Sequence, residues 1–135
     1  MRFPTGLPLI LRRVEFAGPL GRVKADLILD TGAVFTALGW QELRAIGYDP
    51  AVVPDRQVII TANGVIQVPK VTVESVRLGE AQATEVEVIC HDVPEAGIVS
   101  GLLGLSFLKH FRTVIDYRNG YCEITEVQKE LNNDR

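Results

Sequence analysis

The chain has 135 residues, which suggests a single domain and is enough to enclose a hydrophobic core. Hydrophobic residues make up 47% and charged residues 23%, as in an ordinary soluble globular protein. The net charge is −3 and the basic residues form no cluster, which argues against binding to nucleic acid or to an anionic membrane surface.

The N-terminal apolar segment, residues 7–11, is too short to span a membrane. Pro8 interrupts it, Arg12 and Arg13 follow it, and no small-residue cleavage site comes after it. We therefore expect no membrane span and a cytoplasmic location.

Turn signals recur along the chain, and the segments between them favour β-strands. The first two strands are expected over 10–16 and 22–29, around a turn over 17–21. The second of them alternates at first and then becomes apolar on both faces, which is typical of a strand that enters the core.

A short helix is expected over 39–47, with Trp40, Leu43 and Ile46 on one face and Gly47 as its C-terminal stop. Strands over 57–60 and 65–73 follow it. Between these strands, Asn63-Gly64 predicts a hairpin with a type I′ turn, because both residues tolerate positive φ. The remaining expected elements are strands over 71–78 and 83–90, a short helix over 105–111 with Leu105, Leu108 and Phe111 on one side, and a hairpin of 112–117 with 121–125 across a second Asn-Gly turn.

These elements predict a mainly β fold, a small barrel or sandwich with one or two short helices. We expect one domain over residues 1–125 and a polar C-terminal tail over 126–135. Cys90 and Cys122, the only cysteines, lie outside any C-x-x-C pair, so we expect small buried residues on strands rather than a disulfide framework, with their redox state left open. His91 and His110 are not spaced to complete a zinc site with them, and no metal site is predicted.

Asp30 ends the apolar run 27–29 and is followed by Thr31, Gly32 and Ala33. A carboxylate in this position is partly desolvated, so its charge depends on its neighbours. Gly32 lets the backbone turn tightly, and the Thr31 hydroxyl can hydrogen-bond without adding charge. An aspartate that caps a helix or makes an Asx-turn would look the same, so this tripeptide alone does not establish chemistry.

Two further elements accompany Asp30. Leu102 and Leu103 precede Gly104 and a short amphipathic helix, a pattern that core packing also explains. Between this element and Asp30 lies the turn 61–64 of the expected hairpin, followed by Val65. Each element is common alone, so the information lies in their combination and order.

The three elements in this order resemble the retropepsin-like aspartic proteases, the single-domain relatives of pepsin, and look most like their bacterial and cellular branch. The active-site loop of that family, apolar-apolar-Asp-Thr/Ser-Gly-Ala, is matched by residues 28–33, and its closing motif by residues 102–104. The resemblance covers roughly residues 10–125. It implies a small closed barrel-like acid-protease fold, with a flap hairpin at about 60–69.

By this resemblance, Asp30 is the catalytic aspartate, Thr31 interlocks with its counterpart in a partner chain, and Gly32 offers its amide to the carboxylate. The residues expected to support this loop are Ala33, Leu102, Leu103 and Gly104. Those expected to contact substrate or to form the flap are Val34, Phe35, Ala62, Asn63, Gly64 and Val65. Val34 and Phe35 stand where retroviral members often have acidic residues, so we expect a more apolar cleft. The single glycine of the flap predicts a stiffer hairpin than the retroviral one, and Ser100 stands where relatives often have Asp.

Peptide hydrolysis by this chemistry needs two aspartates that share one proton. No second Asp-Thr/Ser-Gly occurs in the chain, so the resemblance implies a homodimer with Asp30 of each copy on the two-fold axis. By analogy with the family, the terminal strands and the tail are the expected contacts. Water is the nucleophile, and no metal or organic cofactor is implied.

The sequence thus favours an aspartic endopeptidase that acts on peptide or protein substrates. The alternative is a catalytically inactive retropepsin-fold module for dimerisation or peptide binding, because a fold does not guarantee activity. A β-rich scaffold with an accidental Asp-Thr-Gly would require all three elements to coincide by chance.

Overall fold

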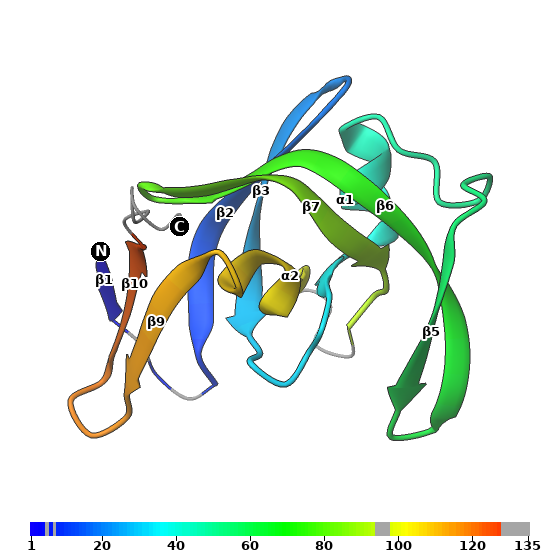
Figure 1. Ribbon diagram of the computed structural model, residues 1–135. Helices are drawn as coiled ribbons and strands as arrows, with labels where there is room; N and C mark the ends of the chain where they lie inside the picture. Colours follow the sequence, from blue (N-terminus) through cyan, green and yellow to red (C-terminus); the bar gives the residue numbers. More distant parts are fainter. Residues whose placement is uncertain (5, 7, 94–97, 128–135) are drawn as a thin grey trace, which may run out of the picture.

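The computed structural model describes residues 1–4, 6, 8–93 and 98–127. Its strands form a seven-stranded sheet in the order β2-β3-β8-β4-β7-β6-β5 and a three-stranded sheet in the order β1-β10-β9 (Figure 1). The elements in chain order are β1 (Arg2–Pro4), β2 (Ile10–Gly18), β3 (Gly21–Leu29), β4 (Thr36–Leu38), α1 (Trp40–Ala45), β5 (Arg56–Thr61), β6 (Gly64–Leu78), β7 (Ala81–Cys90), β8 (Gly101–Leu103), α2 (Leu105–Leu108), β9 (Phe111–Asp116) and β10 (Tyr121–Glu126).

The larger sheet closes into a barrel because β2 pairs with β6 as well as with β3. Six strands therefore form a ring, and β5 extends the sheet beyond it. At the closing seam, the Glu15 carboxylate accepts hydrogen bonds from Arg77 at 2.7 Å and Arg22 at 3.2 Å. The hydrogen bond from Arg77 lowers the pKa of Glu15, which keeps this ion pair charged. The predicted mainly β, barrel-like fold is confirmed.

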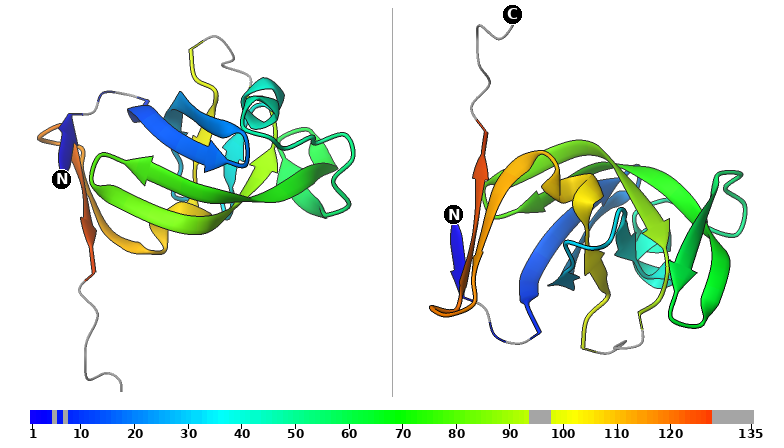
Figure 2. Two further views of the ribbon diagram at one scale, coloured as in Figure 1. Left: turned by 90° about the horizontal axis from the view of Figure 1, so that it is seen from above. Right: turned by 60° about the horizontal axis from the view of Figure 1, so that its bottom comes forward.

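The barrel encloses the main hydrophobic core. The expected entry of the second strand into the core is confirmed, since Ala25, Leu27 and Leu29 of β3 are all buried. Among the largest fully buried side chains are Phe16, Phe107, Leu11, Leu27, Leu38, Leu43, Ile46 and Leu103. The three-stranded sheet and the β5–β6 hairpin lie on opposite sides of this barrel (Figure 1 and Figure 2). The hairpin is therefore free to project from the barrel rather than pack into its core.

The strand predictions differ from the structure in two respects. The expected strands over 65–73 and 71–78 are one strand, β6, whose 15 residues serve both the projecting hairpin and the barrel. The short strands β1, β4 and β8 were not predicted, because three residues are too few for an alternating pattern to be recognised.

Both helices are shorter than predicted, and the residues that they bury differ from the predicted ones. Leu43 and Ile46 are buried as expected, but Trp40 begins α1 with 38% of its surface exposed. α2 ends at Leu108 because β9 already begins at Phe111. Its buried residues include Leu108 but not Leu105, which is 39% exposed.

The predicted type I′ turn at Asn63-Gly64 is wrong, although the hairpin forms. Thr61 pairs with Gly64, so Ala62 and Asn63 are the central residues, and the positive φ of 124° belongs to Gly64. The Thr61 hydroxyl stabilises this turn, because it accepts a hydrogen bond from the Asn63 N–H and donates one to the Gly64 carbonyl. In the last hairpin too, the glycine has the positive φ, 74° at Gly120.

Cys90 and Cys122 are free thiols buried on β7 and β10, as predicted. Burial raises the pKa of Cys90 to about 11, so this thiol stays protonated near neutral pH. No helix in the described part of the chain is long and apolar enough to cross a membrane. Of the predicted tail, Glu126 still belongs to β10, and residues 128–135 lie outside the described residues.

At Gly101, the backbone of β8 lies very close to the backbone of β4. A Cβ there would overlap the Ala37 carbonyl oxygen of the adjacent strand β4. Gly101→Ala is therefore expected to lower the free energy of unfolding by about 1–3 kcal/mol, because the two backbones must separate. Urea denaturation measures the change. Gly6→Ala is the control, since a Cβ at Gly6 meets nothing within 4 Å, and an equal loss in both variants would contradict the explanation.

Candidate active site

Asp30 lies where two parallel strands of the barrel end side by side. In β3, Leu29 is opposite Leu103 of β8, and the next residue, Asp30, donates its backbone N–H to the Leu103 carbonyl at 3.0 Å. The two apolar motifs of the sequence are thus neighbours in the fold. Their pairing fixes the backbone that presents the Asp30 carboxylate at one end of the barrel.

The loop after β3 folds back on the Asp30 side chain. One carboxylate oxygen accepts a hydrogen bond from the Gly32 N–H at 3.0 Å, and the Ala33 N–H donates to the Asp30 carbonyl at 3.2 Å. Asp30 itself is half-buried, whereas Thr31 and Gly32 are exposed. The loop therefore orients the carboxylate and leaves its Thr-Gly crest on the protein surface.

Buried hydrogen bonds support this loop from below. The Thr36 N–H donates to the Ser106 hydroxyl at 2.8 Å, and the Gly104 N–H donates to the Thr36 hydroxyl at 3.1 Å. The Leu105 N–H donates to the Ala33 carbonyl at 2.8 Å. Ser106 was not predicted as a site residue, although its position as a lone polar residue in an apolar run was a usable signal.

Gly104 brings these elements into contact. A Cβ at this position would lie 2.6 Å from the Phe35 carbonyl oxygen and 2.7 Å from the Ala33 carbonyl oxygen. Only a residue without a side chain lets the start of α2 approach the loop so closely. Ala33, Leu103 and Gly104 thus lie together under the loop, and their supporting role stays a prediction.

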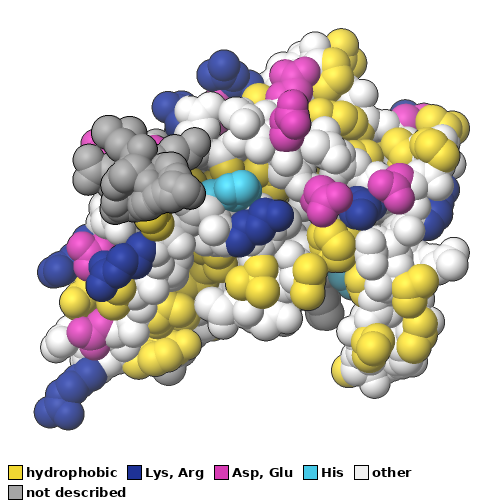
Figure 3. All heavy atoms as spheres, in the orientation of Figure 1, with side chains coloured by type: hydrophobic (Ala, Val, Ile, Leu, Met, Phe, Trp, Pro, Cys, Tyr) yellow, Lys and Arg dark blue, Asp and Glu magenta, His cyan; other side chains and the backbone are white. Residues whose placement is uncertain are grey.

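A cleft of about 640 Å³ separates the Asp30 loop from the β5–β6 hairpin, and its wall is mainly apolar. Asp30 is the only carboxylate among the described residues that line it. Hydrophobic side chains also gather on the projecting hairpin, at the lower right of Figure 3. The lining residues are Asp30, Gly32, Ala33, Val34, Phe35, Ala37, Gln57, Val58, Ile59, Ile60, Thr61, Ile89, His91 and Leu102.

The cleft includes only part of the predicted site. Val34, Phe35 and Leu102 line it, but Leu103 points into the barrel core. The predicted flap residues Ala62, Asn63, Gly64 and Val65 lie at the hairpin tip, beyond the cleft wall. Instead, β5 supplies that wall over residues 57–61, and Ala37, Ile89 and His91 are further lining residues that the sequence did not indicate.

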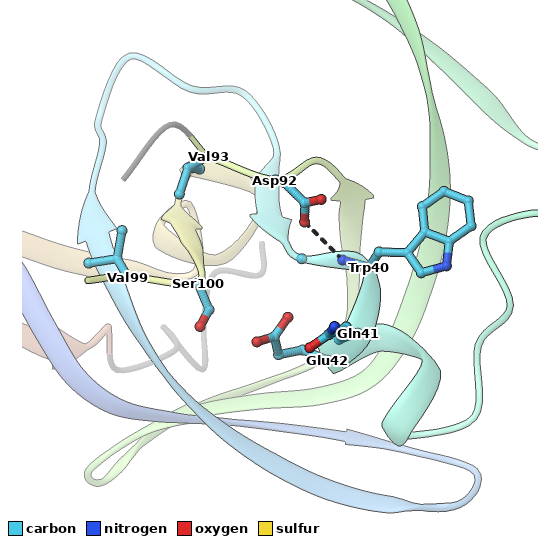
Figure 4. Close-up of a pocket in the computed structure, with 8 residues that line it drawn as sticks. Trp40, Gln41, Glu42, Asp92, Val93, Val99 and Ser100 are labelled. Carbon is cyan, nitrogen blue, oxygen red and sulfur yellow. Dashed lines mark hydrogen bonds between the residues drawn. The ribbon is translucent and has the colours of Figure 1, made fainter. Parts of the chain in front are cut away.

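A second pocket, of about 290 Å³, lies at the opposite end of β8, around Ser100 (Figure 4). Asp92 accepts a hydrogen bond there from the Trp40 N–H at 3.2 Å, and the Glu42 carboxylate lies nearby. Gly39, the N-cap residue of α1, has no side chain for this task, so Asp92 caps the helix in its place. The described residues hold no group of three or more His, Cys, Asp or Glu that could bind a metal.

Comparison with known proteins identifies the family. The family model described as "gag-polyprotein putative aspartyl protease" matches residues 18–110. The chain belongs to this aspartyl protease family. A crystal structure of a retropepsin-like aspartic protease from Rickettsia conorii matches with a TM-score of 0.70 and 22% identity, over 92% of this chain and 88% of that one. This similarity shows that the chain has the retropepsin-like fold, while a search of curated proteins by sequence found no match.

Two threonines of the chain provide a matched test of the hydrogen bonds under the loop. Thr36→Val leaves the buried Gly104 N–H without its partner and is expected to lower the free energy of unfolding by about 1–3 kcal/mol. Thr113→Val removes a buried hydroxyl that has no hydrogen-bond partner among the described residues, so stability should stay equal or rise. Thermal and urea denaturation measure both changes. Equal effects of the two substitutions would argue against the supporting role of Thr36.

Proposed function

We propose that the chain is an aspartic endopeptidase that works as a homodimer, with a water molecule activated between the Asp30 carboxylates of two copies. The observation that carries this proposal is the Asp30 carboxylate, which alone among the described residues brings a negative charge to a mainly apolar cleft, on a loop whose Thr31-Gly32 crest is exposed. Membership of the aspartyl protease family and the retropepsin-like fold support the same chemistry.

The need for a second copy follows from the chemistry. One carboxylate must act as a base and another as an acid, but Asp30 is the only carboxylate among the described residues of the cleft. Association about a two-fold axis at Thr31 and Gly32 would bring a second Asp30 to the first. The exposed crest of the loop is available for such a contact.

In the proposed reaction, the ionised carboxylate takes a proton from water as the water oxygen attacks the scissile carbonyl carbon. The protonated carboxylate gives its proton to the carbonyl oxygen, which yields a neutral tetrahedral diol. When the carbon–nitrogen bond breaks, a diol hydroxyl returns its proton to one carboxylate, and the leaving nitrogen takes the proton held by the other. The Gly32 N–H, donating to Asp30 at 3.0 Å, orients the carboxylate throughout.

The other predicted site residues keep supporting roles in this proposal. Ala33, Leu102, Leu103 and Gly104 hold the loop, Val34 and Phe35 contact the substrate, and the hairpin tip, 62–65, folds over it to exclude water. Residues 1–125 act as one catalytic domain, and 126–135 as a polar tail. The terminal strands remain the proposed dimer contact: β1 pairs with β10 of its own chain, and its other edge is unpaired among the described residues.

The alternative is a dimerisation or peptide-binding module without activity. The observation that favours it is the apolar character of Val34 and Phe35, which offer no side-chain hydrogen bond to a substrate backbone. The same experiment separates the two hypotheses.

The test is cleavage of a peptide library between pH 4 and 7. We expect cleavage by the wild type and a loss of at least about 10²-fold in kcat/KM for Asp30→Asn, because an amide cannot exchange the proton. Asp49→Asn is a matched control, since Asp49 accepts a similar hydrogen bond from the Ala51 N–H at 3.1 Å, outside the cleft. Size-exclusion chromatography with mass detection gives the oligomeric state of each variant.

Cleavage that survives in Asp30→Asn would remove Asp30 from this role, and a wild type that stays monomeric under all conditions would contradict the dimer. A proven dimer that cuts no peptide would favour the binding module.

A further inference from the structure

Phe35 forms part of the cleft wall, and a lysine lies behind it. The ammonium nitrogen of Lys70 is 5.1 Å from the centroid of the Phe35 ring, close enough for a cation–π interaction. Lys70 belongs to β6 and is not among the described residues that line the cleft. Only 16% of its side chain is exposed, which is unusual for a lysine and indicates that the ammonium group is held in place.

Polar groups from both neighbouring strands surround the ammonium group. Its nitrogen lies 3.4 Å from the Glu87 carboxylate on β7 and 4.0 Å from the Asp55 carboxylate just before β5. It also donates to the side-chain oxygen of Gln57 at 3.4 Å, and the Lys70 backbone N–H donates to the Asp55 carbonyl at 3.0 Å. One side chain thus connects the base of the projecting hairpin to the barrel wall.

Phe35 belongs to a small apolar cluster that is separate from the main core. The buried members are Ala37, Val68 and Ile89, against which Phe35, Ile59 and Leu102 pack. Five of these six line the cleft, and Ile89 lies directly opposite Lys70 in the β6–β7 ladder. The floor of the cleft is therefore an apolar cluster that is separate from the barrel core, and Lys70 lies beside it.

The charges make this arrangement depend on Lys70. Two carboxylates, Asp55 and Glu87, face one ammonium group. Without the cation they repel each other across the start of the hairpin, and Phe35 loses the group that holds its ring against the cluster. Both effects would change the width of the cleft while leaving Asp30 untouched.

We propose that Lys70 is a positioning residue: it fixes Phe35 and the base of the β5–β6 hairpin, and thereby sets the preference of the cleft for a large apolar substrate side chain. This preference rests on the proposed function, whereas the effect on the hairpin does not. Among the contacts of Lys70, Phe35 and Gln57 line the cleft, so its influence on a substrate passes through the Phe35 ring and the base of the hairpin.

The first experiment needs no activity. Amide hydrogen exchange is measured on wild type, Lys70→Met and Lys70→Arg, with the β9–β10 hairpin as internal reference. In Lys70→Met, the amides of β5 should exchange at least about fivefold faster, with β9–β10 unchanged, because local opening of the hairpin no longer has to break the ion pairs. Lys70→Arg, which keeps the charge, should stay near the wild type. Equal acceleration in both hairpins, or none in β5, would overturn the proposal.

The second experiment measures selectivity with a pair of peptides. They differ at one position, the one at which the wild type discriminates most: one peptide has a large apolar residue there, and the other has Ala. Lys70→Met should reduce the ratio of the two kcat/KM values by about fivefold or more, and Lys70→Arg should restore it. Added to Phe35→Leu, Lys70→Met should have a smaller effect than it has alone, since part of its influence passes through the Phe35 ring. Lys24→Met, at an exposed lysine on β3, is the matched control.

An unchanged ratio in Lys70→Met, or fully independent effects of the Lys70 and Phe35 substitutions, would overturn the role in selectivity. A wild type that cleaves no peptide of the library would refute the proposed function, and the exchange data would still decide the positioning role. If Lys70→Met does not fold, Glu87→Gln removes the charge of the nearer of the two carboxylates and should shift β5 exchange in the same direction. No acceleration in that variant would again overturn the proposal.

Discussion

The parallel pairing of β3 with β8 is the constraint on which the rest of the site depends. It brings Leu29 beside Leu103, and so places Asp30 and Gly104 at the same end of the barrel. Gly104 can then approach the loop backbone, and the Thr36 and Ser106 hydroxyls complete the buried hydrogen bonds beneath it. Strand pairing and these buried hydrogen bonds therefore hold the Asp30 loop in place, which is the preorganisation that the proposed chemistry requires.

The buried apolar residues form two separate clusters, one in the barrel core and one under the cleft. The barrel core is enclosed by strands and buries residues such as Phe16 and Phe107. A separate cluster, which includes Ala37 and Ile89, lies under the β5–β6 hairpin and forms the cleft floor. Because Asp30 is the one carboxylate that the described part of the chain brings to the cleft, the proposed chemistry makes a single chain half of an active site. In that half, Lys70 is proposed to keep the cleft in shape.

Much of the fold and the centre of the site could be predicted from the sequence, because alternation reveals long strands and the Asp30 loop is a local motif. The short strands β4 and β8 could not, since their existence depends on pairing between distant segments. Asn63-Gly64 correctly indicated the hairpin, but it indicated the wrong turn type. The Thr61 hydroxyl stabilises a turn with Ala62 and Asn63 at its centre instead. Lys70 in an alternating strand looks exposed, and only the tertiary structure places Phe35, Asp55 and Glu87 around it.

The central claim, one active site built from two copies of Asp30, is tested most directly by mixing wild-type chains with Asp30→Asn chains after subunit exchange has been verified. If each site needs two aspartates, random association with an equal amount of the variant reduces activity per wild-type chain to about half, and an excess abolishes it. Activity per wild-type chain that stays constant at every ratio would show that one chain suffices, and would contradict this account.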